Sequence, residues 1–145
     1  MMRALALDLG TKTCGFAISD EGMIIASALE TLHFEENDFN AIIEQIKIYQ
    51  KTYKIDKLVL GKPLRSNNTS SERTVLFESF AHKLKGIFKD YKIYQVNEYG
   101  TTIAATNILK EAKLSIKKRK AHKDTLSAVL ILQEFLNYGG VELHD

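Results

Sequence analysis

Residues 2–20 read MRALALDLGTKTCGFAISD, and the fold that the sequence predicts is built outward from this stretch. Residues 3–7 form a mostly apolar run without polar alternation, which is typical of a strand buried on both faces. The run ends at Asp8, Leu9 and Gly10, where turn-forming residues begin. Residues 14–19 predict a second strand, and residues 20–22 predict the tight turn that follows it.

The rest of the chain changes between strand and helix patterns. Residues 23–32 predict a third strand, and residues 57–60 and 92–96 predict two more. One helix is predicted with Asn37 or Asp38 as its N-cap and with the apolar stripe Phe39, Ile42, Ile43, Ile46, Tyr49 and Tyr53. A second carries the stripe Leu76, Phe77, Phe80, Leu84, Ile87 and Phe88. Two further helices are predicted over about residues 101–112 and 121–137.

This order of elements predicts an α/β fold. The first three strands form an antiparallel meander, and the later strands join it in parallel through right-handed crossovers. The result is a mixed five-stranded sheet with helices on both faces. With 145 residues, of which 45% are hydrophobic, the chain fits a single domain over residues 1–145.

Charge and cysteine content narrow the function classes. A net charge of +2 is too small to indicate a nucleic-acid partner by itself. Residues 113–123, KLSIKKRKAHK, hold six lysine or arginine residues and no acid, which is either a solvated surface or a phosphate-binding one. The single Cys14 excludes an internal disulfide. The short apolar run before Asp8 suits neither a signal peptide nor a membrane span, so we expect a cytoplasmic protein without a membrane partner.

Two carboxylates stand at the ends of predicted parallel strands, where sites form in open α/β sheets. Asp8 ends the first such strand and Glu98 ends the last, so we expect them to lie side by side. Alternatively, Asp8 only forms a turn before Gly10, and Glu98 only caps the helix that begins near Gly100.

Asp124 is a third candidate, on the last predicted helix. Positions 124, 128, 131 and 135 share one helical face, and the last three are Ala128, Ile131 and Phe135. A carboxylate on such a core-facing stripe is costly unless it is paired or binds metal. If the helix instead began at Lys123, Asp124 would be an ordinary cap.

Three oxygen ligands suit Mg²⁺ or Mn²⁺, whereas zinc would prefer histidine and cysteine. His33, His82, His122 and His144 show no metal-ligand spacing. A carboxylate cluster of this kind supports metal-assisted hydrolysis of a phosphodiester. Because the basic run leads directly into Asp124, its phosphate-binding interpretation is favoured, with Lys117, Lys118, Arg119 and Lys120 as substrate-binding residues.

Four motifs together resemble the YqgF family, also called RuvX. They are DLGTKTCGFAISD (8–20), VLGKPL (59–64), NEYGTTIAA (97–105) and KDTLSAVLILQEFL (123–136), and they cover nearly the whole chain. Members are described as Holliday junction resolvases or as pre-16S rRNA nucleases, with an RNase H-like fold. The resemblance implies that Asp8, Glu98 and Asp124 are the catalytic acids. It also implies that residues 61–63 and the following loop, which includes Arg65, border the site.

The sequence departs from the family pattern at three positions near the site. Thr13 replaces an arginine, and Asn97 and Tyr99 flank Glu98 where the family has aspartate and arginine. Lys12 and Lys62 are expected to supply the phosphate contacts that the arginines would make. Since the three acids are intact, we expect an active enzyme with an altered substrate preference.

Three classes of function compete at this point. The leading one is a metal-dependent endonuclease that matures the 5′ end of 16S rRNA, acting in ribosomal precursor particles. Its close rival is a resolvase of four-way DNA junctions, which needs two active sites and therefore a dimer. The second class is a nucleic-acid-binding factor without catalysis. The third, an actin-like ATPase suggested by residues 8–12, is set aside because ATP binds there between two such domains. The sequence does not separate RNA from DNA as the substrate, and it leaves the oligomeric state open.

Overall fold

The computed structural model describes residues 2–62, 71–97 and 116–144, with side chains except those of residues 62, 71–73, 97 and 116–124. Its strands are β1 (Arg3–Leu9), β2 (Thr13–Ser19), β3 (Ala26–His33), β4 (Ile55–Lys62), β5 (Lys92–Asn97) and β6 (Val141–Glu142). Its helices are α1 (Asn40–Thr52), α2 (Ser71–Ile87) and α4 (Ile116–Tyr138). The helix predicted over residues 101–112 lies outside the described residues. None of the described helices combines the length and apolarity that a membrane crossing requires.

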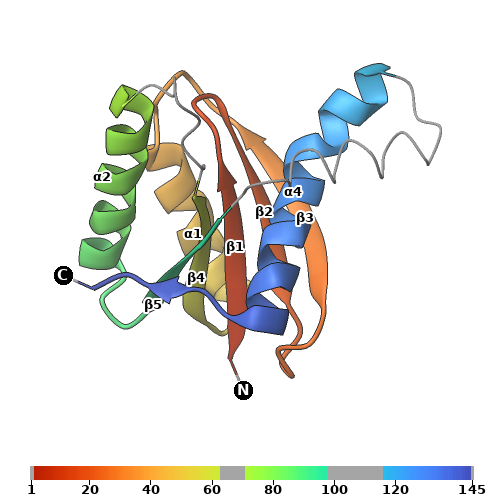
Figure 1. Cartoon of the computed structure of the whole chain (residues 1–145), viewed down its shortest axis with the longest axis vertical. Coiled ribbons are helices and arrows are strands. Elements are labelled where there is room, and N and C mark those ends of the chain that lie inside the picture. The colour runs from red at the N-terminus through yellow and green to blue at the C-terminus, as the bar shows by residue number, and fades with distance from the viewer. Residues whose placement is uncertain (1, 63–70, 98–115, 145) are drawn as a thin grey trace.

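The strands form one mixed sheet in the order β3-β2-β1-β4-β5-β6 (Figure 1). The antiparallel meander of β1, β2 and β3 is confirmed, as is the parallel pairing of β1 with β4 and of β4 with β5. The prediction of five strands was wrong by one. The sixth strand, β6, has only two residues, too few to show any period in the sequence.

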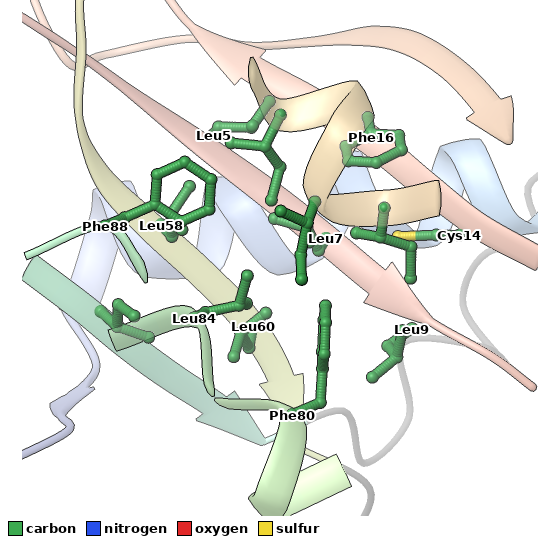
Figure 2. Packing of buried hydrophobic residues seen from close by; sticks show 14 of the residues in the cluster. Leu5, Leu7, Leu9, Cys14, Phe16, Leu58, Leu60, Phe80, Leu84 and Phe88 are labelled. Carbon is green, nitrogen blue, oxygen red and sulfur yellow. The ribbon is translucent and has the colours of Figure 1, made fainter. Parts of the chain in front are cut away.

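The two faces of β1 explain why its run is apolar throughout. Leu5 and Leu7 point into a core formed with α1 and α2, whereas Ala4 and Ala6 pack against α4. Figure 2 shows the larger core, in which Phe80 and Leu84 of α2 face the leucines of β1 and β4. The prediction of helices on both faces is therefore confirmed, with α1 behind the sheet in Figure 1 and α4 in front.

Two details of the predicted helices were wrong. Neither Asn37 nor Asp38 caps α1: Phe39 holds the N-cap position without a side-chain hydrogen bond. Asn37 has a left-handed backbone (φ 62°), and its N–H donates to the Thr11 carbonyl, so it belongs to the preceding loop. Ile87 is 42% exposed because α2 ends there, and Phe88 fills the core instead.

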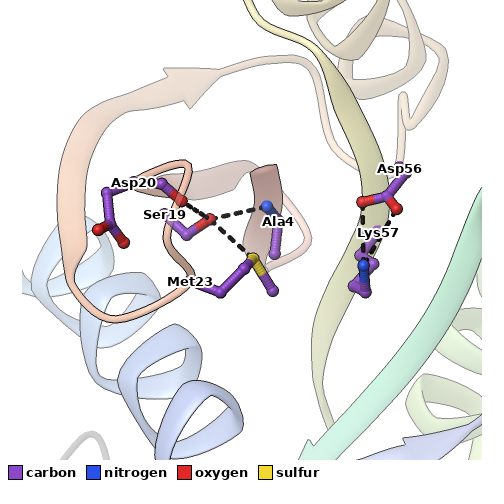
Figure 3. Close-up of polar contacts among 6 residues, drawn as sticks. All are labelled: Ala4, Ser19, Asp20, Met23, Asp56 and Lys57. Carbon is purple, nitrogen blue, oxygen red and sulfur yellow. Dashed lines mark hydrogen bonds and ion pairs between the residues drawn. The ribbon is translucent and has the colours of Figure 1, made fainter. Parts of the chain in front are cut away.

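The turn between β2 and β3 is built around Ser19 and Asp20 at the end of the sheet where β1 begins (Figure 3). The buried Ser19 hydroxyl accepts a hydrogen bond from the Ala4 N–H at 2.8 Å and donates to the Asp20 carbonyl at 3.0 Å. The Asp20 carboxylate accepts from the N–H groups of Ile24 and Ile25. Turn chemistry was predicted here from the sequence, and the structure confirms it.

Candidate functional site

The carboxyl ends of the three parallel strands meet at one edge of the sheet, as the site prediction requires. β1 ends at Leu9, β4 at Lys62 and β5 at Asn97. β4 runs between β1 and β5, so the ends of these two strands are not neighbours, and the expectation that Asp8 and Glu98 lie side by side stays a prediction. Two strand spacings, about 10 Å in total, therefore separate the two strands. Glu98 follows Asn97 in the sequence and lies outside the described residues.

Asp8 is on the face of β1 that α4 covers. Side chains alternate along a strand, so Asp8 shares the face of Ala4 and Ala6, which are fully buried against α4. Asp8 itself is only partly buried, which suits a carboxylate that meets solvent and ligands. It pairs across the ladder with Gly15 of β2, a residue without a side chain.

A continuous row of residues connects Asp8 to α4. Gly15, opposite Asp8, pairs on its other side with Thr31 of β3. The Thr31 hydroxyl is hydrogen-bonded to the hydroxyl of Thr125 on α4. Thr125 directly follows Asp124, so the turn of α4 that carries Asp124 is tied to the same row of the sheet as Asp8.

The helix pattern around Asp124 also matches the structure. Ala128, Ile131 and Phe135 are buried on the sheet-facing side of α4, and Asp124 is one turn before Ala128 on that stripe. Because α4 begins at Ile116, eight residues earlier, the interpretation of Asp124 as a helix cap was wrong. The Asp124 side chain lies outside the described part of the chain.

The predicted phosphate-binding residues lie in several places. Lys12 is exposed in the turn between β1 and β2, and Lys62 ends β4, both at the edge that holds Asp8. Lys117, Lys118, Arg119 and Lys120 occupy the first turns of α4, which project beyond that edge in Figure 1. Arg65 lies outside the described residues.

Three hydroxyl residues of this region were missed by the sequence analysis. Thr31 and Thr125 are 94 residues apart, and no local pattern signals that they meet. Ser127 is fully buried on α4, and its hydroxyl has no hydrogen-bond partner among the described residues. Its position, three residues after Asp124 on a core-facing stripe, was the one signal available.

Metal-binding capacity rests on residues that the structure describes only in part. No three histidine, cysteine, aspartate or glutamate side chains gather at a metal-binding distance in the described ranges. Of the three proposed ligands, Asp8 alone has a described side chain. On the opposite face of the sheet, a cavity of about 20 Å³ between β4 and α2 holds no more than one water.

Sequence relatives of the chain are nucleases by name. A family model described as "RuvX: Holliday junction resolvase" matches residues 2–138. A relative from Mycoplasmopsis pulmonis, named "Putative pre-16S rRNA nuclease", is 44% identical over 138 residues, covering 94% of both chains. A relative of the same name from Ureaplasma parvum is 44% identical over 143 residues, covering 94% of this chain and 97% of its own.

Solved structures of resolvases share the fold. T. thermophilus RuvC in complex with a Holliday junction substrate aligns with a TM-score of 0.60 at 12% identity, covering 99% of this chain and 100% of that one. The Fowlpox virus resolvase in complex with Holliday junction DNA also reaches a TM-score of 0.60, at 13% identity, covering 94% of this chain and 97% of its own. The RNase H-like fold is thus confirmed, and the chain belongs to the RuvX family.

Proposed function

We propose that this protein is a divalent-metal-dependent endonuclease that hydrolyses phosphodiester bonds in the precursor of 16S rRNA. The observation that carries the proposal is the row Asp8, Gly15, Thr31 and Thr125, which ties α4 at Asp124 to the level of Asp8. This row supports the proposal that two acids 116 positions apart in the sequence share one end of one face of the sheet. The names of the relatives at 44% identity supply the RNA substrate.

The donor set fits Mg²⁺ or Mn²⁺. Asp8, Glu98 and Asp124 offer only carboxylate oxygens, the ligands that these hard cations prefer. Ser127, three residues after Asp124, is fully buried on α4, and its hydroxyl has no hydrogen-bond partner among the described residues. When bound, the metal lowers the pKa of a coordinated water and stabilises the charge on the leaving oxygen.

The remaining residues hold the substrate in place. Lys12 and Lys62 stand at the edge next to Asp8, and the first turns of α4 bring four more cations to the same end of the molecule. Arg65 follows Lys62 by three positions. Cations so arranged neutralise the phosphates that flank the bond to be cut, and they would bind RNA and DNA backbones alike.

Changes from the family pattern act on substrate preference in this proposal. Thr13 begins β2 and is partly buried, so it offers a hydroxyl where the resemblance implies a cationic arginine. Asn97 ends β5 directly before Glu98. Neither residue changes the number of proposed metal ligands, so the proposal retains an active enzyme. A cytoplasmic location and a single domain also remain predictions.

Cleavage of defined substrates, with and without Mg²⁺, tests the proposal. We expect cutting of a pre-16S rRNA fragment only when the metal is present, and a rate more than about 100-fold lower in Asp8→Asn, since even residues that only orient metal ligands are worth 10–100-fold. Asp56→Asn is the matched control, because Asp56 pairs with Lys57 at the opposite edge of the sheet. Undiminished cleavage in Asp8→Asn would eliminate the mechanism.

A second candidate function follows from the description of the family model, Holliday junction resolvase. A resolvase cuts two strands symmetrically, so it works as a dimer on a four-way junction. Preferential cleavage of four-way DNA by a dimeric form would favour this candidate over RNA processing. Tight binding of either substrate without cutting would instead show a nucleic-acid-binding factor.

A further inference from the structure

We propose that Thr31 and Thr125 are positioning residues. Their hydrogen bond fixes where the turn of α4 that carries Asp124 lies along the sheet, relative to Asp8 on β1. The inference rests on the proposed function, in which these two acids share a cation. It concerns neither the cation nor the substrate directly. It concerns the function of one hydrogen bond, between the edge strand β3 and the helix α4.

The hydrogen bond joins two otherwise separate parts of the fold. Thr31 belongs to β3, which lies two strands from β1, and it reaches Asp8 only through the ladder pairs at Gly15. Two ladder steps span about 10 Å in a rigid sheet. Thr125 is the residue after Asp124. Fixing Thr125 against Thr31 therefore fixes the Asp124 turn against the row that contains Asp8.

The apolar contacts of α4 hold the helix against the sheet but are less specific in direction than a hydrogen bond. The helix packs on small side chains of the sheet, among them the fully buried Ala4, Ala6 and Ala17. Val59 and Val96 complete this face, and hydrophobic contacts of this kind are non-directional. A hydrogen bond has narrow distance and angle limits, so it adds a directional constraint at the end of α4 that carries Asp124.

A second polar contact, made by Gln133, holds the C-terminal half of α4 against the sheet. The Gln133 side chain accepts a hydrogen bond from the Ala26 N–H at 3.1 Å and donates to the Ile24 carbonyl at 3.0 Å. Gln133 is eight residues after Thr125, or about 12 Å along the helix. The threonine pair and Gln133 thus both hydrogen-bond α4 to the β2–β3 hairpin, but only the threonine pair includes a residue adjacent in sequence to a proposed metal ligand.

Loss of the threonine pair should weaken metal binding. Ligands must be held within about 0.5 Å of their working positions. Groups that orient metal ligands without touching the metal are worth about 10–100-fold in metal affinity. Thr125→Val and Thr31→Val keep the shape of the side chain but remove the hydroxyl. We therefore expect α4 to keep its apolar packing while the turn that carries Asp124 is no longer held in one position on the sheet.

The test measures Mn²⁺ affinity directly, by counting free Mn²⁺ from its electron paramagnetic resonance signal, beside the cleavage rate and the thermal midpoint. We expect an affinity loss of about 10-fold in each valine variant and no further loss in the double variant, because both changes remove one bond. Thr125→Ser and Thr31→Ser should restore the affinity. Gln133→Leu is the matched control and should lower the thermal midpoint while leaving Mn²⁺ affinity unchanged.

Several outcomes would overturn the inference. Unchanged Mn²⁺ affinity in folded Thr31→Val is one, and this variant carries the test even if Thr125→Val fails to fold, since Thr31 lies on an edge strand. An equal affinity loss in Gln133→Leu is another, because it would reveal a general effect of helix stability. Asp124→Asn separates the two proposals. If this variant binds Mn²⁺ normally, the proposed function itself fails. If this variant loses Mn²⁺ binding while the valine variants keep it, only the positioning role of the threonines fails.

Discussion

At the residue scale, the carboxylate of Asp20 makes the turn between β2 and β3 dependent on pH. One of its oxygens accepts hydrogen bonds from the N–H groups of Ile24 at 2.7 Å and Ile25 at 2.9 Å. These donors, Ile25 first and Ile24 second, hold the pKa of Asp20 below its ordinary value of 3.8. Hydrogen bonds to a charged acceptor favour the charged form.

The sign of the pH effect follows from this lowered pKa. A carboxyl group with a lower pKa in the folded state stabilises the protein above the unfolded pKa, and this stabilisation is lost as the pH falls through the folded pKa. We therefore expect wild type to exceed Asp20→Asn in urea midpoint by a constant amount between pH 7 and about pH 5. The gap should begin to narrow below about pH 4, where the unfolded chain takes up the proton, and it should close once the pH lies below the folded pKa and Asp20 is neutral in both states.

Asparagine is a suitable comparison because its side-chain oxygen still accepts hydrogen bonds from Ile24 and Ile25. Any difference between the two proteins therefore reports the charge and not the geometry of the turn. Urea titrations at four pH values, monitored by circular dichroism, give the comparison. A gap that stayed the same at pH 3.5 and pH 7 would show that the charge of Asp20 contributes nothing.

Single residues also mark the limit of what the sequence predicts about the site. Asp8 was predicted as a site residue because it ends the first parallel strand, where sites form in open α/β sheets. Thr31 and Thr125 were not, because a threonine on a strand or helix has many ordinary roles. Their pairing depends on how α4 lies across the hairpin, and that is a property of the folded molecule.

At the element scale, glycine positions separate helix propensity from packing. Gly86 is in the last turn of α2, and a Cβ there would meet nothing within 4 Å. Gly140 joins α4 to β6, and a Cβ there would lie 2.9 Å from the Gln95 carbonyl oxygen and 3.2 Å from the Val96 side chain. The same substitution should therefore have opposite effects at the two sites.

We expect Gly86→Ala to raise the free energy of unfolding by up to about 1 kcal/mol, since alanine loses less backbone entropy in a helix. Gly140→Ala should lower it by about 1–3 kcal/mol, because β6 must move away from β5 to make room. Urea unfolding with a shared m-value measures both changes. A neutral Gly140→Ala would mean that β6 is not held against β5 as the structure has it.

Elements with a clear hydrophobic pattern were predictable, and those without one were not. β1 is an unbroken apolar run and α1 carries an apolar stripe at helical spacing, and both were found within three residues of their true bounds. β6 has two residues and forms only because Gly139, with φ at 82°, ends α4 and turns the chain back toward β5. The cap of α1 was misplaced because burial of Phe39 overrode the capping preference of Asn37 and Asp38.

At the scale of the whole molecule, the order of the strands in the sheet could not be predicted from the sequence. The carboxyl ends of parallel strands share one edge whatever their order, so Asp8 and the end of β5 were correctly assigned to the same edge. Which strand lies between them depends on the crossover connections. The structure inserts β4, whose last residue is Lys62, between β1 and β5.

The distribution of charge is also a property of the whole molecule. The first turn of α4 has no acidic residue, and Lys117, Lys118, Arg119 and Lys120 follow its first residue directly. Cations near a helix N-terminus oppose the helix dipole and cost stability. A protein that keeps four of them there, at the end of the molecule that carries Asp8, is better explained by binding of anions than by stability.

Salt dependence of RNA binding tests that explanation. Each phosphate contact to a single strand contributes about 0.7 to the slope of log affinity against log salt concentration. Replacing the four cations at 117–120 with glutamine should therefore lower the slope by about 3 for a single-stranded pre-16S rRNA fragment, measured by fluorescence anisotropy in Ca²⁺ to prevent cutting. The same variant should gain a little thermal stability, because the repulsion at the helix N-terminus is gone.

A matched control removes four exposed lysines from the α1 and α2 side, namely Lys47, Lys51, Lys83 and Lys89. Both variants change the net charge from +2 to −2, so they differ only in where the charge is lost. If the basic end of α4 binds the substrate, the control keeps most of its salt slope. Equal slopes in the two variants would mean that RNA binding depends only on the total charge of the protein, and the position of these four cations at the start of α4 would then have no part in binding.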